Sequence, residues 1–218
     1  MPNIEEVRYK MIEQQIRPWD VSDSTVLGLF STIRREDFLP VAQKSLAFVD
    51  MAVALPAGQT MLQPRIQARL LQDAAVQPTD KVLEIGTGTG YMTALLARMA
   101  QRVLSLEINA ELVELARANL QRAGITNVEV RHADGALGAP VEAPFDVIVL
   151  GGSVREMPQS LLKQLKVGGR LVGIVGSEPI MHGTVITRTG DAQFTSVQKW
   201  DDNAPALQGF AQPPAFKF

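Results

Sequence analysis

The sequence has 218 residues, of which 46% are hydrophobic and 20% charged, a balance typical of one globular domain. Its net charge of −2 argues against a basic surface for nucleic acid or an anionic membrane, so we expect neither as a partner. It contains no cysteine, which excludes disulfides, thiolate metal ligands and thiol nucleophiles. The histidines, His132 and His182, lack metal-ligand spacing, so no metal site is expected.

Residues 1–60 are predicted to form a helical extension. Apolar residues recur at helical spacing from Ile4 up to Pro18, and a second helix is expected to begin at Ser22-Asp23. A short helical stretch is expected over residues 42–48. The charged N-terminus has no apolar run of signal length and no later segment is long enough to cross a membrane, which predicts a cytoplasmic protein.

Residues 61–176 alternate predicted helices and strands, and residues 177–218 add an edge hairpin and a tail, all within a single domain spanning 1–218. This alternation is typical of an α/β fold with a doubly wound, mostly parallel Rossmann-like sheet and an antiparallel hairpin at its edge. The expected helices begin at Pro64, after Gly90, at Ala110 and at Pro158; the expected strands are Lys81–Ile85, Arg102–Leu106, Val128–Arg131, Phe145–Leu150, Arg170–Val175, Gly183–Arg188 and Phe194–Trp200.

A glycine-rich turn, KVLEIGTGTG, follows the first of these strands at residues 81–90. Glycines at 86, 88 and 90 suit a tight turn because glycine tolerates positive φ and lets the backbone approach a ligand. The spacing is not GxGxxG, since Tyr91 stands where the last glycine of a dinucleotide fingerprint would fall. The turn therefore fits a nicotinamide or flavin cofactor poorly.

Acidic residues stand at or just after the carboxyl ends of three successive predicted strands. Glu84 would be ill placed beside a pyrophosphate but suits a cofactor that carries an ammonium and a sulfonium. Glu107 ends the second strand, where an acid can accept the ribose hydroxyls, and Asp134-Gly135 follows the third, near the expected adenine. Together these turns are similar to the S-adenosyl-L-methionine site of class I methyltransferases.

Over nearly its whole length the chain resembles the protein-L-isoaspartate O-methyltransferases. The resemblance is carried by MIEQQIR at 11–17, GQT at 58–60, VLEIGTGTGY, Asp134-Gly135, APFD at 143–146 and LKQLKVGGRL at 162–171. It implies an S-adenosylmethionine-dependent O-methyltransferase that leaves S-adenosyl-L-homocysteine as product. The implied cofactor contacts are Gln59, Thr60, Met61, Glu84, Gly86, Thr87, Gly88, Thr89, Gly90, Glu107, Asp134 and Gly135.

The chain departs from the family pattern where the substrate should bind. The family's loop reads GQTIS, with a functionally important serine, whereas this chain has Leu62 at that position, next to the other expected catalytic position, Thr60. An apolar side chain cannot donate a hydrogen bond to an incoming carboxylate. Ser153 or Arg155 could supply a replacement polar group, and both also fit an ordinary loop; the tail 205–218 lies where the family closes its substrate cleft.

The leading hypothesis from the sequence is a repair enzyme that methylates the carboxylate of isoaspartyl residues in damaged proteins. One alternative is a methyltransferase of the same fold with a different peptide or small-molecule acceptor, because a fold hosts many chemistries. The other is an S-adenosylmethionine-binding protein that has lost catalysis. The sequence predicts no oligomeric state.

Overall fold

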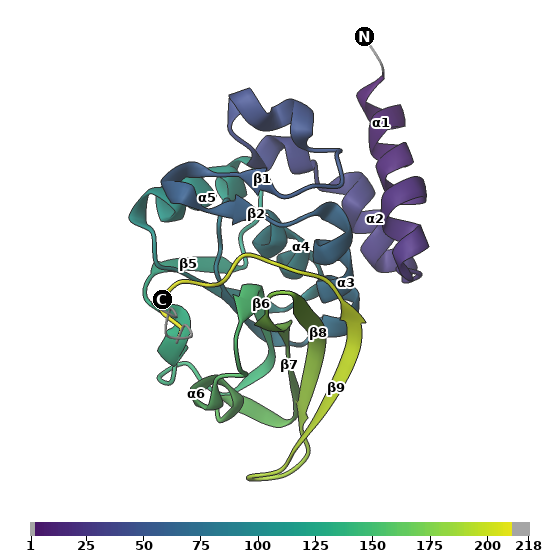
Figure 1. The fold of residues 1–218 in the computed structure, drawn as a ribbon. Helices are drawn as coiled ribbons and strands as arrows, with labels where there is room; N and C mark the ends of the chain where they lie inside the picture. The colour runs from purple at the N-terminus through teal and green to yellow at the C-terminus, as the bar shows by residue number, and fades with distance from the viewer. Residues whose placement is uncertain (1–2, 211–218) are drawn as a thin grey trace, which may run out of the picture.

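The computed structural model describes residues 3–210, and its centre is a mixed sheet covered by helices (Figure 1). The sheet strands are β3 (Lys81–Ile85), β4 (Arg102–Glu107), β5 (Val128–His132), β6 (Phe145–Val154), β7 (Leu165–Ser177), β8 (Ile180–Arg188) and β9 (Phe194–Asp201). Across the described residues their order is β5-β4-β3-β6-β7-β8-β9, with β5 to β7 parallel and the last two strands antiparallel. The predicted doubly wound sheet with an antiparallel edge hairpin is confirmed.

Helices cover both faces of this sheet, which explains why its central strands are almost wholly apolar. On one face, α3 (Pro64–Ala74), α4 (Tyr91–Met99) and α5 (Ala110–Arg122) pack against the valines of the strands. On the other face, α6 (Gln159–Leu162) packs against leucine and isoleucine side chains. Pro64 occupies the first turn of α3, as the sequence predicted.

The N-terminal extension contains α1 (Ile4–Met11) and α2 (Ser24–Thr32), which join the same buried cluster as α3 to α5. The side chain of Asp23 caps α2, as expected. The single helix predicted up to Pro18 is wrong, because the chain winds as a π-helix over Ile12–Ile16 and then tightens into a 3-10 turn. Met11, Ile12 and Ile16 are buried at this apolar spacing, whereas Ile4 is exposed, and the spacing does not distinguish an α-helix from these windings. The expected stretch at 42–48 is a 3-10 helix, Val41–Leu46.

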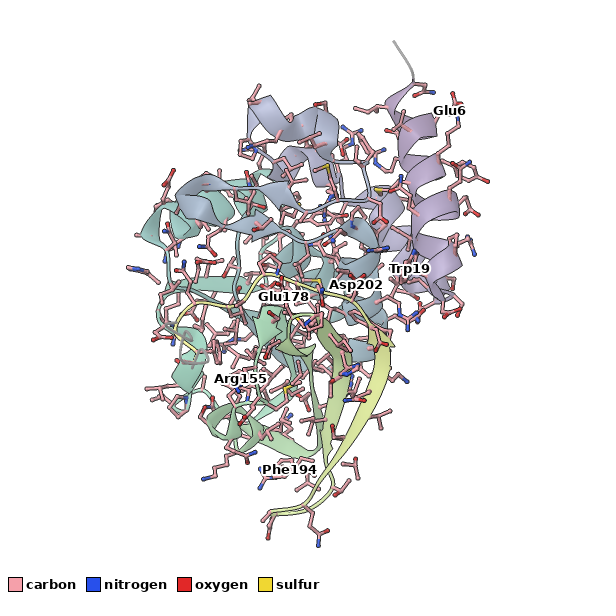
Figure 2. The ribbon with its side chains drawn as sticks, viewed as in Figure 1. Glu6, Trp19, Arg155, Glu178, Phe194 and Asp202 are labelled. Carbon is pink, nitrogen blue, oxygen red and sulfur yellow. The ribbon has the colours of Figure 1, made fainter. Side chains whose placement is uncertain are left out.

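One side chain of α3 joins the extension to the C-terminal part of the chain. The guanidinium of Arg65 lies 4.0 Å from the ring centroid of Trp19 and 3.0 Å from a carboxylate oxygen of Asp202. Trp19 and Asp202 accordingly lie on the same side of the molecule (Figure 2). The extension is thereby fixed against the chain segment that leaves β9.

Two predicted boundaries after β6 are wrong. The sequence predicts that the helix beginning at Pro158 extends through Leu165 to the Gly168-Gly169 pair, but the helix ends at Leu162, and Leu165 instead begins β7. The Gly168-Gly169 pair lies inside that strand, where a Cβ on Gly169 would be 2.9 Å from the carbonyl of Asp146. Glycine therefore permits close strand contact here instead of ending a helix.

The order of strands places a topological switch point between β3 and β6. From β3 the chain runs outward through β4 to β5, then crosses back to β6 on the other side of β3. Ligands bind at the carboxyl ends of strands at such a point. Among residues 3–210, no helix is long and apolar enough to cross a membrane.

Candidate active site

The glycine-rich turn leaves β3 at the switch point and enters α4. Gly86, Gly88 and Gly90 have φ values of 89°, 55° and 87°, all in the region that disfavours residues with a Cβ. Gly90 precedes Tyr91, the first residue of α4. The three glycines therefore serve the turn conformation that their spacing predicted.

Glu107, at the end of β4, holds this turn in place. Its Oε2 accepts a hydrogen bond from the N–H of Gly88 at 2.8 Å, and its Oε1 accepts one from Asn109 at 3.0 Å. The residue is 4% exposed. Each carboxylate oxygen has a second lone pair, so Glu107 can still accept a hydrogen bond from a ligand hydroxyl.

Glu84 lies behind the turn and has no exposed surface. Its Oε2 accepts hydrogen bonds from Thr93 at 2.5 Å and Ser105 at 2.6 Å, while Oε1 has no partner among residues 3–210. Burial raises the pKa of this carboxyl to about 7; the two hydroxyls oppose the rise, and the charge of Glu107 adds to it. Glu84 is thus a buried acid poised near neutrality.

This raised pKa predicts a pH-dependent stability. Between the ordinary glutamate pKa of 4.5 and the folded-state value of about 7, the folded protein keeps a proton that the unfolded chain has released. As the pH rises through this interval, the contribution of Glu84 to the free energy of unfolding should therefore fall by roughly 3 kcal/mol. Below and above the interval this contribution should not change with pH. Denaturant titrations from pH 4 to 8 should show a flatter profile for Glu84→Gln than for the unmodified chain. Equal slopes would show that Glu84 ionises normally.

Asp134 and Gly135 follow β5, and both lie close to other parts of the site. Asp134 is exposed and its Oδ1 accepts a hydrogen bond from Ala136 at 2.9 Å. A Cβ on Gly135 would lie 2.3 Å from Ile85, at the end of β3, and one on Gly209 would lie 2.4 Å from Oδ1 of Asp134. The structure therefore brings this third turn and the chain after β9 together at the same edge.

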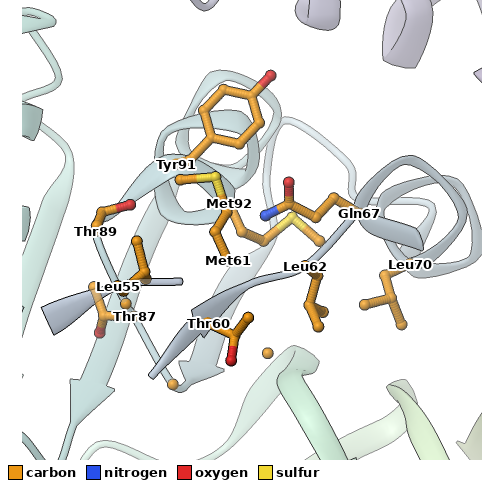
Figure 3. Close-up of a pocket in the computed structure, with 13 residues that line it drawn as sticks. Leu55, Thr60, Met61, Leu62, Gln67, Leu70, Thr87, Thr89, Tyr91 and Met92 are labelled. Carbon is orange, nitrogen blue, oxygen red and sulfur yellow. The ribbon is translucent and has the colours of Figure 1, made fainter. Parts of the chain in front are cut away.

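The loop that contains GQT at 58–60 lies over the glycine turn. It forms a small antiparallel pair, β1 (Val53–Ala54) and β2 (Thr60–Met61). Residues from this loop, from α3 and from the turn line one pocket (Figure 3). The pocket contains seven of the predicted site residues: Thr60, Met61, Leu62, Gly86, Thr87, Gly88 and Thr89. The other predicted residues do not line it: Gln59, Glu84, Gly90, Glu107, Asp134 and Gly135.

Sequence reasoning missed six residues that line the pocket: Leu55, Gln67, Leu70, Tyr91, Met92 and Gly151. One signal for Gln67 was available, because it lies one helical turn before Leu70 and Leu71 on the inward stripe of α3. A polar side chain on an apolar stripe often has a specific partner. Gly151 gave no signal, since its importance depends on the pairing of β6 with β3.

The two polar residues proposed as replacements for the loop serine lie elsewhere. Ser153 is buried, and its hydroxyl donates to the carbonyl of Ala204 at 2.8 Å. Its backbone N–H donates to the carbonyl of Pro205, and its carbonyl accepts a hydrogen bond from the N–H of Leu207. Arg155 is exposed beyond the end of β6 (Figure 2) and borders a different cavity. Ser153 thus anchors the tail, whose residues 211–218 lie outside the described range.

Comparison with known proteins identifies the family. The protein-L-isoaspartate(D-aspartate) O-methyltransferase family model matches residues 6–200. A protein-L-isoaspartate O-methyltransferase of Rhodopseudomonas palustris is 41% identical over 207 residues, covering 93% of this chain and 95% of its own. One from Koribacter versatilis is 45% identical over 181 residues, covering 83% and 81%.

Two solved structures share this fold. A protein-L-isoaspartate O-methyltransferase structure is 27% identical with a TM-score of 0.78, covering 94% of this chain and 66% of its own. A structure from Plasmodium falciparum in complex with S-adenosyl-L-homocysteine is 20% identical with a TM-score of 0.77, covering 95% and 99%, and shares the fold. The chain belongs to the protein-L-isoaspartate(D-aspartate) O-methyltransferase family.

Proposed function

We propose that this protein transfers a methyl group from S-adenosyl-L-methionine to the free α-carboxylate of isoaspartyl residues in damaged proteins or peptides. The observation that carries the proposal is the shared pocket, in which the loop residues Thr60–Leu62 face the glycine turn Gly86–Thr89. Family membership along most of the chain supports the same activity. A cytoplasmic location and the absence of nucleic-acid and membrane partners remain predictions from composition.

The polar groups around the turn fit this cofactor. Oε1 of Glu84 and Oγ1 of Thr89 are buried atoms without a partner among the described residues, so both can still accept hydrogen bonds. An amino-acid end with an ammonium group supplies such donors, and the free lone pairs of Glu107 suit ribose hydroxyls. We therefore assign Glu84, Gly86–Gly90 and Glu107 to cofactor binding, with Asp134-Gly135 toward the adenine.

For this methyl transfer the protein needs mainly to bind and orient the two reactants. The cofactor supplies the methyl group, activated by its positive sulfur. The free carboxylate of an isoaspartyl residue is ionised at neutral pH and attacks without a general base. The pocket residues hold the acceptor in line and exclude water, an arrangement that can contribute roughly 7–11 kcal/mol to lowering the barrier. Leu55, Leu62 and Leu70 make much of this lining apolar.

The test uses cofactor with a labelled methyl group. With an isoaspartyl peptide the protein should form a base-labile ester that releases labelled methanol, and a matched aspartyl peptide should give none. Label on another acceptor in place of the isoaspartyl peptide would indicate the alternative substrate class. Cofactor binding without turnover on any acceptor would indicate a protein that has lost catalysis.

Leu62→Ser tests the loop residue directly. Leu62 is 4% exposed within the main buried cluster, so truncation should lower the free energy of unfolding by about 2–4 kcal/mol. If Leu62 impedes the acceptor, the new hydroxyl should nevertheless raise kcat/KM for isoaspartyl peptide. Kinetics well below the Tm of the variant would separate the two effects. A lower kcat/KM in fully folded variant would show that the apolar side chain favours this enzyme's substrate.

A further inference from the structure

A buried arginine lies directly behind the pocket. Arg35 is 1% exposed, and its guanidinium carbon lies 5.4 Å from the ring centroid of Tyr91. Within residues 3–210 it has no carboxylate within ion-pair distance, since nearby Asp50 pairs with Arg65 instead. Burial lowers the pKa of Arg35 to about 10, so it remains a cation at neutral pH. A buried charge without a paired carboxylate is costly and calls for an explanation.

Arg35 contacts two groups that belong to the pocket lining. Its Nη2 donates to the carbonyl of Leu62 at 2.8 Å, and its Nη1 donates to Oε1 of Gln67. A guanidinium has only donors, so it can accept nothing from an amide nitrogen. Arg35 therefore dictates which end of the Gln67 amide faces it, and the oxygen must be that end.

The other end of the amide is consequently turned toward the pocket. Gln67 is 5% exposed and lines the pocket, and no described residue accepts a hydrogen bond from its Nε2. In the view of Figure 3 the amide nitrogen of Gln67 points to the left, toward Met92, and the amide oxygen points to the top of the view. The pocket thus contains an oriented N–H donor that neither the side chain of Leu62 nor the thioethers can supply.

The surroundings of this donor favour an anionic acceptor. None of the thirteen residues that line the pocket is charged, and the Arg35 cation lies behind the Gln67 amide. In an apolar pocket, a positive charge behind an N–H donor favours a negatively charged partner. The proposed reaction brings two carboxylates to this site: that of the cofactor's amino-acid end and that of the acceptor.

We propose that Gln67 Nε2 binds a carboxylate in the pocket, and that Arg35 is a positioning residue that fixes the Gln67 amide for this contact. The choice of the methylated acceptor rests on the proposed function, but the binding role does not. A purely structural alternative also exists, in which Gln67 serves only to satisfy Arg35. The two roles make opposite predictions for one isosteric substitution.

Gln67→Glu is that substitution. A glutamate still accepts from Arg35 and forms an ion pair with it, so the thermal stability should not fall. It offers no donor to the pocket and places negative charge there. Gln121→Glu, on the exposed surface of α5, is the matched control for the added charge, because Gln121 does not line this pocket.

Two measurements distinguish the source of the carboxylate. Calorimetry compares S-adenosylhomocysteine with its decarboxylated analogue, S-adenosyl-3-thiopropylamine. If Gln67 binds the cofactor carboxylate, Gln67→Glu should weaken the binding of S-adenosylhomocysteine by about tenfold or more relative to the binding of S-adenosyl-3-thiopropylamine. If it binds the acceptor, that affinity ratio should hold while KM for isoaspartyl peptide rises about tenfold and kcat changes little.

Substitutions at Arg35 test the positioning role. Lysine also only donates hydrogen bonds, so the affinity ratio and KM of Arg35→Lys should stay close to those of the unmodified protein. Arg35→Met frees the Gln67 amide to turn. It should change the affinity ratio or KM, whichever Gln67→Glu changes, and in the same direction. If Arg35→Met does not fold, Gln67→Glu still decides the question. A folded Gln67→Glu variant with both the affinity ratio and KM unchanged would overturn the proposal. If the unmodified protein methylates no isoaspartyl peptide, the Kd of that peptide replaces KM in this comparison.

Discussion

Replacing Gly151 with alanine is expected to weaken S-adenosylhomocysteine binding roughly a hundredfold, with a matching loss of activity. Gly151 follows Leu150, which pairs with Ile85 across the β3–β6 contact. A Cβ at this position would lie 2.5 Å from the carbonyl oxygen of Gly86 and 3.1 Å from that of Ile85. Both are backbone atoms that no rotamer change can move, so the glycine turn itself must shift.

Gly28→Ala is the control for this experiment. Gly28 lies within α2, and a Cβ there would meet no atom within 4 Å. Alanine should therefore leave binding unchanged and raise the free energy of unfolding by about 0.5–1 kcal/mol. Calorimetry on both variants, with circular dichroism to confirm folding, makes the comparison. Normal binding by Gly151→Ala would show that the turn does not need its observed position.

Removing the acid of β4 has the second largest expected effect. Glu107→Ala should weaken S-adenosylhomocysteine binding by more than tenfold, because a charged acceptor for the ribose is lost. The structure adds a second reason, since Glu107 also accepts the hydrogen bonds of Gly88 and Asn109. The turn should loosen, and the Tm should fall as well.

Glu107→Gln separates these two contributions. The amide keeps one acceptor oxygen for the backbone but loses the charge and half of the acceptor capacity. Its Tm should lie between those of the unmodified protein and Glu107→Ala, while its affinity should remain reduced. Unchanged affinity of both variants, measured by calorimetry, would show that the ribose binds elsewhere.

Most of the sheet could be predicted from the sequence because its signals are local. Continuous apolar runs mark the buried parallel strands, and Asp23 and Pro64 mark helix starts through backbone chemistry. Windings and boundaries are harder. The π-helical segment at Ile12–Ile16 keeps the apolar spacing of an α-helix, so periodicity does not reveal it.

The site was predictable in part for a related reason. The glycine turn and Glu107 follow strands directly, so their position could be read from strand order. The burial of Glu84, with a pKa raised to about 7, depends on Thr93 and Ser105 from two other elements. Gly151 matters only because β6 lies beside β3.

The central claim is that the turn 86–90 and the loop 60–62 form one site that binds the cofactor and presents its methyl group to an acceptor carboxylate. A crystal structure with S-adenosylhomocysteine and an isoaspartyl peptide tests it most directly. The sulfur should lie in the pocket bordered by Gly86–Thr89, with the isoaspartyl carboxylate facing it beside Thr60–Leu62. Homocysteine bound outside this pocket, or a carboxylate turned away from the sulfur, would contradict the account.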